Sequence, residues 1–195
     1  MPNSHSLAPP WSVSQWFNAQ TLQTPPTLES LSGRVVVVHA FQMLCPACVS
    51  HGLPQALRVH QLFAPVDLVV LGLHTVFEHH AVTGPEALRA FLHEYRIPFP
   101  VGVDKADGRN GIPATMRAYG LRGTPSLVVI DRQGRLQLTH LGLIDDLQLG
   151  ALLATLVAAP ADRPSRLDPA PATASAAPTP PAPGTCQDGV CPVPQ

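Results

Sequence analysis

Two cysteines separated by two residues carry the clearest chemical signal in the sequence. Cys45-Pro46-Ala47-Cys48 follows the apolar, β-branched run of residues 34–41 and precedes a stretch with helical periodicity. A cysteine at the start of that helix meets free backbone N–H groups and the helix dipole, which both stabilise a thiolate. The second cysteine lies one turn further along, on the same side and within disulfide reach. This spacing predicts redox chemistry in which Cys45 attacks a disulfide and Cys48, the more buried thiol, resolves the mixed disulfide.

The composition limits the partners and the compartment. The chain has 195 residues, of which 45% are hydrophobic, so it can bury one ordinary core. Its formal net charge of −1, from 12 basic and 13 acidic residues, gives no electrostatic case for a nucleic-acid or polybasic membrane partner. The sequence lacks an apolar run of about 18 residues, and residues 1–10 lack the basic and apolar regions of a secretory signal. We therefore expect a cytoplasmic monomer, in which four cysteines indicate redox or metal chemistry rather than structural disulfides.

The elements that must position these cysteines alternate between strands and helices. Apolar, β-branched runs predict strands at residues 34–41, 66–73, 99–103, 126–131 and 135–141. Helical periodicity predicts helices at residues 45–63, 85–95, 113–119 and 145–158. Pro54 should kink the first of these helices. Strands that alternate with helices, followed by a hairpin and a final helix, indicate an α/β sandwich.

The composition also divides the chain into three parts. Residues 27–158 hold the alternating elements and form the expected domain. Residues 1–26 form an N-terminal extension whose apolar cluster, which includes Trp11 and Trp16, should pack as a lid on the domain edge; a partner-binding arm is the alternative. Residues 159–195 are rich in proline and alanine, so burial cannot offset their ordering entropy, and we expect a disordered tail.

A second motif, Gly123-Thr124-Pro125-Ser126, stands at the start of the strand predicted at residues 126–131. Together with the CxxC motif it resembles the thioredoxin superfamily, in which a Thr-Pro or Val-Pro dipeptide with a cis peptide bond faces the two cysteines. The resemblance implies that Thr124 and Pro125 bind an incoming polypeptide, which pairs with the backbone like an added strand. It also implies a thiol–disulfide oxidoreductase that acts on protein or small-molecule disulfides and thiols without an organic cofactor. The electron donor is not identified by the sequence.

Four stretches narrow the resemblance to the redoxin-type, TlpA-like members. They are the opening at residues 28–36, the CPxC form of the cysteine motif, the strand at residues 99–104 and the GTP-S/T-xxxID-xxG pattern at residues 123–134. The resemblance implies a thioredoxin-like fold with a central mixed β-sheet flanked by helices. The separation of 80 residues between Cys45 and Pro125 leaves room for the TlpA-like insertion between the CxxC helix and the cis-proline loop.

Two positions depart from the family pattern. Leu44 stands where the family usually has tryptophan before the first cysteine. His39, six residues before Cys45, stands where thioredoxin has a buried acid that accepts the proton of the second thiol. An imidazole can perform that proton transfer near neutral pH, so His39 is a candidate catalytic residue. The alternative is a partly buried, hydrogen-bonded strand histidine.

A thiol peroxidase is one competing function. Peroxiredoxins share the redoxin fold and resemble Pro-x-x-x-Thr-x-x-Cys around their reactive thiol. The corresponding positions before Cys45 hold Val38 and Gln42, so the hydroxyl that activates the peroxide is absent.

A metal-binding or metal-delivery module is a second competing function. Residues 74–80 follow a predicted strand and contain three histidines and a glutamate, so His74 and His79 could join Cys45 and Cys48 around a transition metal. The alternative for this segment is a polar loop with solvated imidazoles. The CxxC spacing favours redox chemistry, and we assign no metal ligands.

The end of the chain carries a second cysteine pair, Cys186 and Cys191. A linker of 27 residues, 159–185, has an end-to-end distance of about 30 Å if it is flexible, which is long enough to reach the CxxC motif. Tethering gives an effective concentration on the order of millimolar. We therefore expect the tail pair to act as a redox relay for Cys45 and Cys48, with metal capture or incidental thiols as alternatives.

Overall fold

The computed structural model describes residues 6–22, 25–107 and 111–160. In that part of the chain the strands are β1 (Val13–Phe17), β2 (Val35–Phe41), β3 (Leu68–His74), β4 (Val101–Asp104), β5 (Ser126–Ile130) and β6 (Leu136–Leu141). The helices are α1 (Leu53–Leu62), α2 (Pro85–Glu94), α3 (Ala114–Ala118) and α4 (Asp146–Ala158). A 3₁₀ turn covers Ala19–Thr21 and a π-helical turn covers Cys48–Gly52.

The predicted elements are confirmed with bounds that differ by one or two residues, except at the first helix. The turn that contains Cys48 is π-helical, and α1 begins only at Leu53. Residues 46–62 are helical without a break, so Pro54 lies inside a helical stretch, and the turn directly before it, Cys48–Gly52, is π-helical. A π-helical turn beside a proline is a common place for a helix to bend, and the kink at Pro54 stays a prediction.

The strands form one sheet in the order β1-β4-β3-β2-β5-β6. β2, β3 and β4 run parallel, whereas β1, β5 and β6 are antiparallel to their neighbours. Every residue of β2 and β3 is buried, because both faces of the sheet are covered. The carboxyl ends of the parallel strands share one edge of the sheet, and at this edge β2 leads into the cysteine motif.

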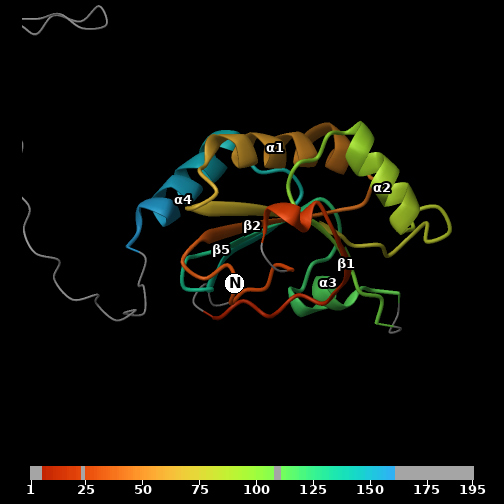
Figure 1. Cartoon of the computed structure of the whole chain (residues 1–195), viewed down its shortest axis with the longest axis horizontal. Coiled ribbons are helices and arrows are strands. Elements are labelled where there is room, and N and C mark those ends of the chain that lie inside the picture. Colours follow the sequence, from red (N-terminus) through yellow and green to blue (C-terminus); the bar gives the residue numbers. More distant parts are fainter. Residues whose placement is uncertain (1–5, 23–24, 108–110, 161–195) are drawn as a thin grey trace, which may run out of the picture. The chain divides into compact units, whose positions relative to one another are not determined.

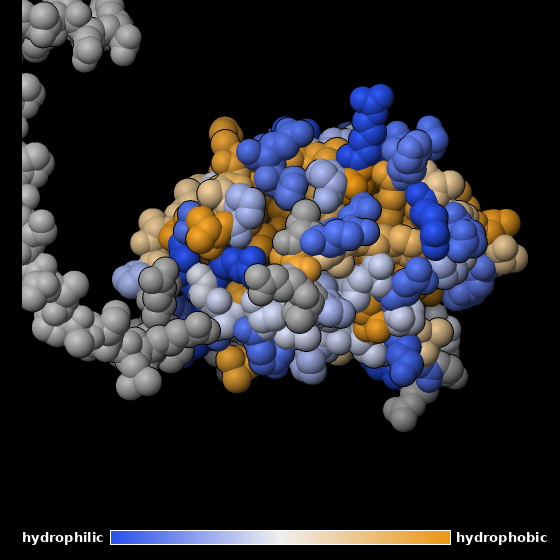
Figure 2. Space-filling view, in the orientation of Figure 1, coloured by the Kyte–Doolittle hydropathy of each residue, from blue (hydrophilic) through white to orange (hydrophobic). Residues whose placement is uncertain are grey.

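Helices and loops cover both faces of this sheet. Figure 1 shows α1, α2 and α4 over one face and α3 on the other, which confirms the mixed, helix-flanked α/β sheet. Each face has its own apolar cluster, centred on Phe41, Leu53 and Leu149 on the first face and on Leu31 and Met116 on the second. No described helix is long and apolar enough to span a membrane, and polar and apolar residues are intermixed on the face in Figure 2.

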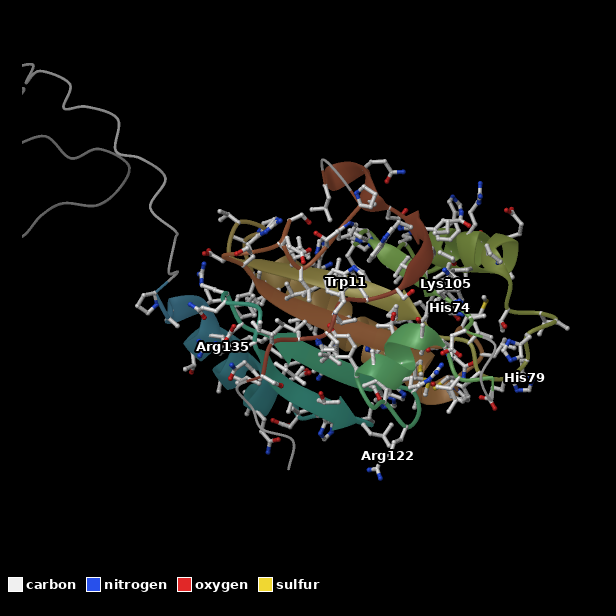
Figure 3. All side chains as sticks on the ribbon, turned by 90° about the horizontal axis from the view of Figure 1, so that it is seen from below. Trp11, His74, His79, Lys105, Arg122 and Arg135 are labelled. Atoms are coloured by element: carbon white, nitrogen blue, oxygen red, sulfur yellow. The ribbon has the colours of Figure 1, made fainter. Side chains whose placement is uncertain are left out.

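Residues 6–17, here called the N-terminal strap, cross the α3 face of the sheet from one edge to the other. Ser6 accepts a hydrogen bond from the backbone of Leu136 at the start of β6, and β1 pairs with β4 at the opposite edge. Between these ends, Trp11 lies over the middle of the sheet (Figure 3), and its indole N–H donates to the carbonyl of Pro26 at 2.7 Å. The strap thus contributes a strand as well as covering one face.

An arginine whose side chain is 11% exposed, Arg132, ties together the end of the sheet opposite the cysteines. The Arg132 guanidinium donates to the carbonyls of Gly33 at 2.8 Å and Val157 at 2.7 Å, and to the Asp67 carboxylate at 2.9 Å. These contacts join the start of β2, the start of β3 and the last turn of α4. The described chain therefore ends, at Pro160, near the amino end of β2 and far from the carboxyl end that precedes Cys45.

Candidate functional site

The two cysteines of the CxxC motif lie in different environments. The Cys48 backbone N–H donates to the Cys45 sulfur at 3.3 Å, and the Cys45 thiol donates to the Thr124 carbonyl at 3.5 Å. Cys45 is half-buried and Cys48 is fully buried. Burial, followed by the hydrogen bond with Cys45, raises the pKa of the Cys48 thiol to about 12. A partner can therefore reach Cys45, whereas Cys48 stays protonated until a reaction changes its surroundings.

The loop before β5 faces these cysteines. The Thr124–Pro125 peptide bond is cis, which confirms the expectation from the family resemblance. The Ser126 hydroxyl donates to the Gly123 carbonyl at 2.7 Å, and the Gly142 N–H donates to the Pro125 carbonyl at 2.8 Å. Both bonds hold the loop so that the Thr124 carbonyl points at Cys45. Residues that are 80 positions apart in the sequence thus form one site.

His39 lies on β2 beneath this site and is 2% exposed. Its ring stacks on Phe41, with 5.9 Å between the ring centroids, and its Nε2 has no hydrogen-bond partner in the described part of the chain. Burial lowers the pKa of His39 to about 4. The partly buried histidine considered above is thus fully buried. Its ring lies against Gly52, and Gly52 also faces Pro125.

Gln42 joins the site to the loop that follows β3, a connection that the sequence did not indicate. Its side-chain amide nitrogen donates to the Glu78 carboxylate at 3.1 Å, and its backbone carbonyl accepts from the Cys45 N–H at 3.2 Å. Gln42 is 2% exposed, so this contact fixes the backbone directly before the reactive cysteine. The sequence showed only that Gln42 is not the threonine of a peroxiredoxin.

His74 is not part of a polar loop, and this expectation was wrong. It is the last residue of β3 and is buried against the Phe41 ring, because its position in the strand points it into the core. Neither ring nitrogen has a hydrogen-bond partner in the described residues, and burial lowers the pKa of His74 to about 4. His79 lies apart from it, exposed on the outer loop (Figure 3).

The residues considered as alternative metal ligands are not assembled in the described part of the chain. Across residues 6–22, 25–107 and 111–160, no group of three or more His, Cys, Asp or Glu side chains is placed to hold a metal ion. Cys186 and Cys191 lie outside the described residues. The structure thus brings together Cys45, Cys48, Thr124, Pro125 and His39.

Exposed leucines border the reactive cysteine. Leu44 directly precedes Cys45 and is 54% exposed. Leu141 and Leu143, at the end of β6 and just beyond it, are also exposed. Gly142 between them is hydrogen-bonded to Pro125, so these leucines lie beside the cis-proline loop. This apolar border offers contact area to a partner whose disulfide reaches Cys45.

No family model and no curated protein matches this chain. Among solved structures, a crystal structure of a thioredoxin-like superfamily protein is 52% identical, with a TM-score of 0.76, over 80% of this chain and 98% of that one. A thiol-disulfide isomerase from Corynebacterium glutamicum is 43% identical, with a TM-score of 0.74, over 82% of this chain and 100% of that one.

A third neighbour, the solution structure of a thioredoxin-like protein in its oxidised form, has the same fold at 20% identity. It covers 80% of this chain and 97% of that one, with a TM-score of 0.65. The fold, the site and the first two structures together define the class: the chain belongs to the thioredoxin-like superfamily. Between the CxxC helix and the cis-proline loop the chain forms β3, α2, β4 and α3. The presence of the TlpA-like insertion in this segment stays a prediction.

Proposed function

We propose that this thioredoxin-like oxidoreductase exchanges disulfides with its partners through Cys45 and Cys48. The observation that carries the proposal is the position of the Cys45 sulfur, 3.5 Å from the Thr124 carbonyl oxygen and 3.3 Å from the Cys48 backbone nitrogen. The N–H group stabilises a thiolate at Cys45, and the adjacent cis-proline loop offers backbone to an incoming chain. The same few residues therefore provide the thiolate that attacks the disulfide and the backbone to which the partner docks.

The reaction consists of two exchanges that together move two electrons. The Cys45 thiolate attacks one sulfur of the partner disulfide, and the other partner sulfur leaves as a thiolate that takes a proton from solvent. Cys48 then attacks the Cys45 sulfur of the mixed disulfide and loses its proton. The second partner thiolate leaves, so the partner is reduced to a dithiol and Cys45 and Cys48 become a disulfide. The same steps in reverse oxidise a partner dithiol.

His39 is the proposed acceptor of the Cys48 proton. Its Nε2 is unpartnered in the described part of the chain, and its ring lies against Gly52, in the turn that begins with Cys48. The pKa values of about 4 for His39 and about 12 for Cys48 keep the proton on sulfur in the resting dithiol. The proton moves only when Cys48 begins to bond to the mixed disulfide, because this bond formation makes the sulfur far more acidic.

The test uses a chromogenic aromatic disulfide, whose released thiolate is counted. The tail cysteines are replaced by serine in every variant, so that only the CxxC motif reports. The reduced protein should release two thiolates, the Cys48→Ser variant one thiolate with a stable mixed disulfide at Cys45, and the Cys45→Ser variant almost none. Equal fast release from the Cys48→Ser and Cys45→Ser variants would refute the assignment of roles.

A parallel measurement separates disulfide exchange from peroxidase activity. Gln42 carries no hydroxyl, and its amide nitrogen is already bonded to Glu78. We therefore expect the reduced protein to consume hydrogen peroxide no faster than an ordinary dithiol. Rapid consumption that is lost in the Cys45→Ser variant would favour the peroxidase.

The tail pair, Cys186 and Cys191, is proposed to relay electrons to or from the CxxC motif. β2 spans roughly 20 Å between the end of the sheet near Pro160 and the cysteine motif, which is within the reach of a linker of this length. Mild oxidation of the Cys48→Ser chain should yield an intramolecular disulfide from Cys45 to a tail cysteine, at a rate independent of protein concentration. If peptide mapping finds Cys45 linked only between chains, the relay is wrong.

A further inference from the structure

Gly52 occupies a position where a side chain has no room. A Cβ atom built on Gly52 would lie 2.3 Å from Cε1 and 2.8 Å from Nε2 of the His39 ring. The same atom would lie 3.3 Å from the Pro125 Cβ. The first two distances are shorter than real Cβ atoms show, so the imidazole fills the space that any other residue at this position would need.

The backbone does not explain this glycine. Gly52 has φ −61° and ψ −51°, which is ordinary right-handed helical geometry that every L-residue adopts. Glycine weakens a helix relative to alanine, because it loses more backbone entropy on folding. A glycine within a helical stretch at a conformation open to alanine therefore indicates a requirement for space.

The turn that contains Gly52 also contains Cys48. The Leu53 N–H donates to the Cys48 carbonyl, a bond from residue i+5 to residue i that makes the turn π-helical. Cys48 and Gly52 are the buried residues of this turn, whereas Ser50 and His51 between them are exposed. Wide turns of this kind occur often at functional sites. Here the turn directs the resolving cysteine and the glycine toward the same interior.

We propose that Gly52 is a positioning residue for disulfide exchange: by lacking a side chain, it lets the His39 imidazole pack against the turn that carries Cys48. The proposal rests on the function proposed above. The ring has few other places to go, because Phe41 stacks on it at an interplanar angle of 5° and Pro125 closes the space beside Gly52. A methyl group at residue 52 therefore displaces the imidazole and weakens its contact with the reaction.

The Gly52→Ala variant tests this placement, and Gly150→Ala is the matched control. Gly150 lies in α4, and a Cβ built there meets no atom within 4 Å. Nitrogen NMR of the reduced protein should show shifted His39 ring resonances in Gly52→Ala and unchanged ones in Gly150→Ala. Unchanged His39 resonances in Gly52→Ala overturn the proposal.

Kinetics test whether the placement matters for the reaction. Resolution of a preformed mixed disulfide at Cys45 should slow by about tenfold or more in Gly52→Ala, the range expected when a positioned proton acceptor is lost. The attack of Cys45 on a small disulfide should change by less than about twofold, because that step precedes the proton transfer. Equal slowing of both steps overturns the proposal.

A His39→Ala background separates positioning from general damage. In that background the ring is absent, so Gly52→Ala should have no further effect on resolution and should fold even if the single variant does not. A Gly52→Ala effect that persists without the ring, or a double variant that stays unfolded, overturns the proposal. If the wild-type protein does not exchange disulfides at all, the proposed function fails, while the NMR shifts still decide whether Gly52 places the ring.

Discussion

Acidification should destabilise this protein through the buried imidazoles of His39 and His74. Burial lowers the pKa of His39 and of His74 to about 4, from an ordinary value of 6.5. Between these two pH values the unfolded chain binds protons that the folded chain does not. The free energy of unfolding therefore falls as the pH drops from 6.5 toward 4, and it is unaffected by these groups above that window.

The magnitude follows from the same values. Each imidazole lowers the free energy of unfolding by up to about 1.4 kcal/mol per pH unit, which amounts to roughly 3 kcal/mol by pH 4. Together they remove roughly 6 kcal/mol, comparable to the whole stability of many domains. Asp104 acts in the opposite direction, because burial raises its pKa and protonation of its carboxyl then favours the folded state as the pH falls.

Urea unfolding at pH 7, 6 and 5 measures this effect, with Trp11 and Trp16 as fluorescent reporters. The matched variant is His74→Leu, which removes one titrating ring without breaking a hydrogen bond in the described residues. Its unfolding free energy should depend on pH about half as steeply as that of the wild-type protein. A wild-type stability that does not change over this range, or an identical slope in the variant, would refute the reasoning.

Three further substitutions test other parts of the structure. Asp104→Asn should lower the free energy of unfolding by about 2 kcal/mol in urea titrations, because the backbone N–H groups of Thr115 and Met116 both need its carboxylate; no loss would contradict this. Arg132→Ala should cost about 3 kcal/mol in the same assay and leave the exchange rate of the folded protein unchanged, since it lies at the opposite end of the sheet. Leu44→Asp should leave stability unchanged and slow the reduction of a protein disulfide more than that of a small one; equal slowing would exclude a docking role.

The central strands and the reactive motifs could be predicted because their signals are local. β2 and β3 are continuous β-branched and leucine runs, which suit strands covered on both faces. The CxxC and Thr-Pro motifs each fix a short piece of backbone chemistry. The pattern of buried strands and helices was therefore enough for the α/β class, and the resemblance of the two motifs to the thioredoxin superfamily implied that Pro125 faces Cys45.

The features that were missed depend on contacts between distant residues. β1 contains only five residues and is stabilised by pairing with β4. Across these strands the Ser14 hydroxyl donates to the Val103 carbonyl, 89 positions away in the sequence. The burial of His74 follows from the strand extending one residue further than predicted. The link from Gln42 to Glu78 joins two loops whose approach only the folded sheet defines.

The N-terminal strap has a consequence for any shortened version of this protein. A chain that began at residue 27 would lose the strand beside β4 and the pairing beside the start of β6 together. Unpaired backbone N–H and C=O groups would then line both outer strands, and such exposed edges pair with strands of other chains. Without Trp11 and Trp16, apolar surface over the middle of the sheet would also meet water. Such a fragment would keep its cysteine motif and still form aggregates.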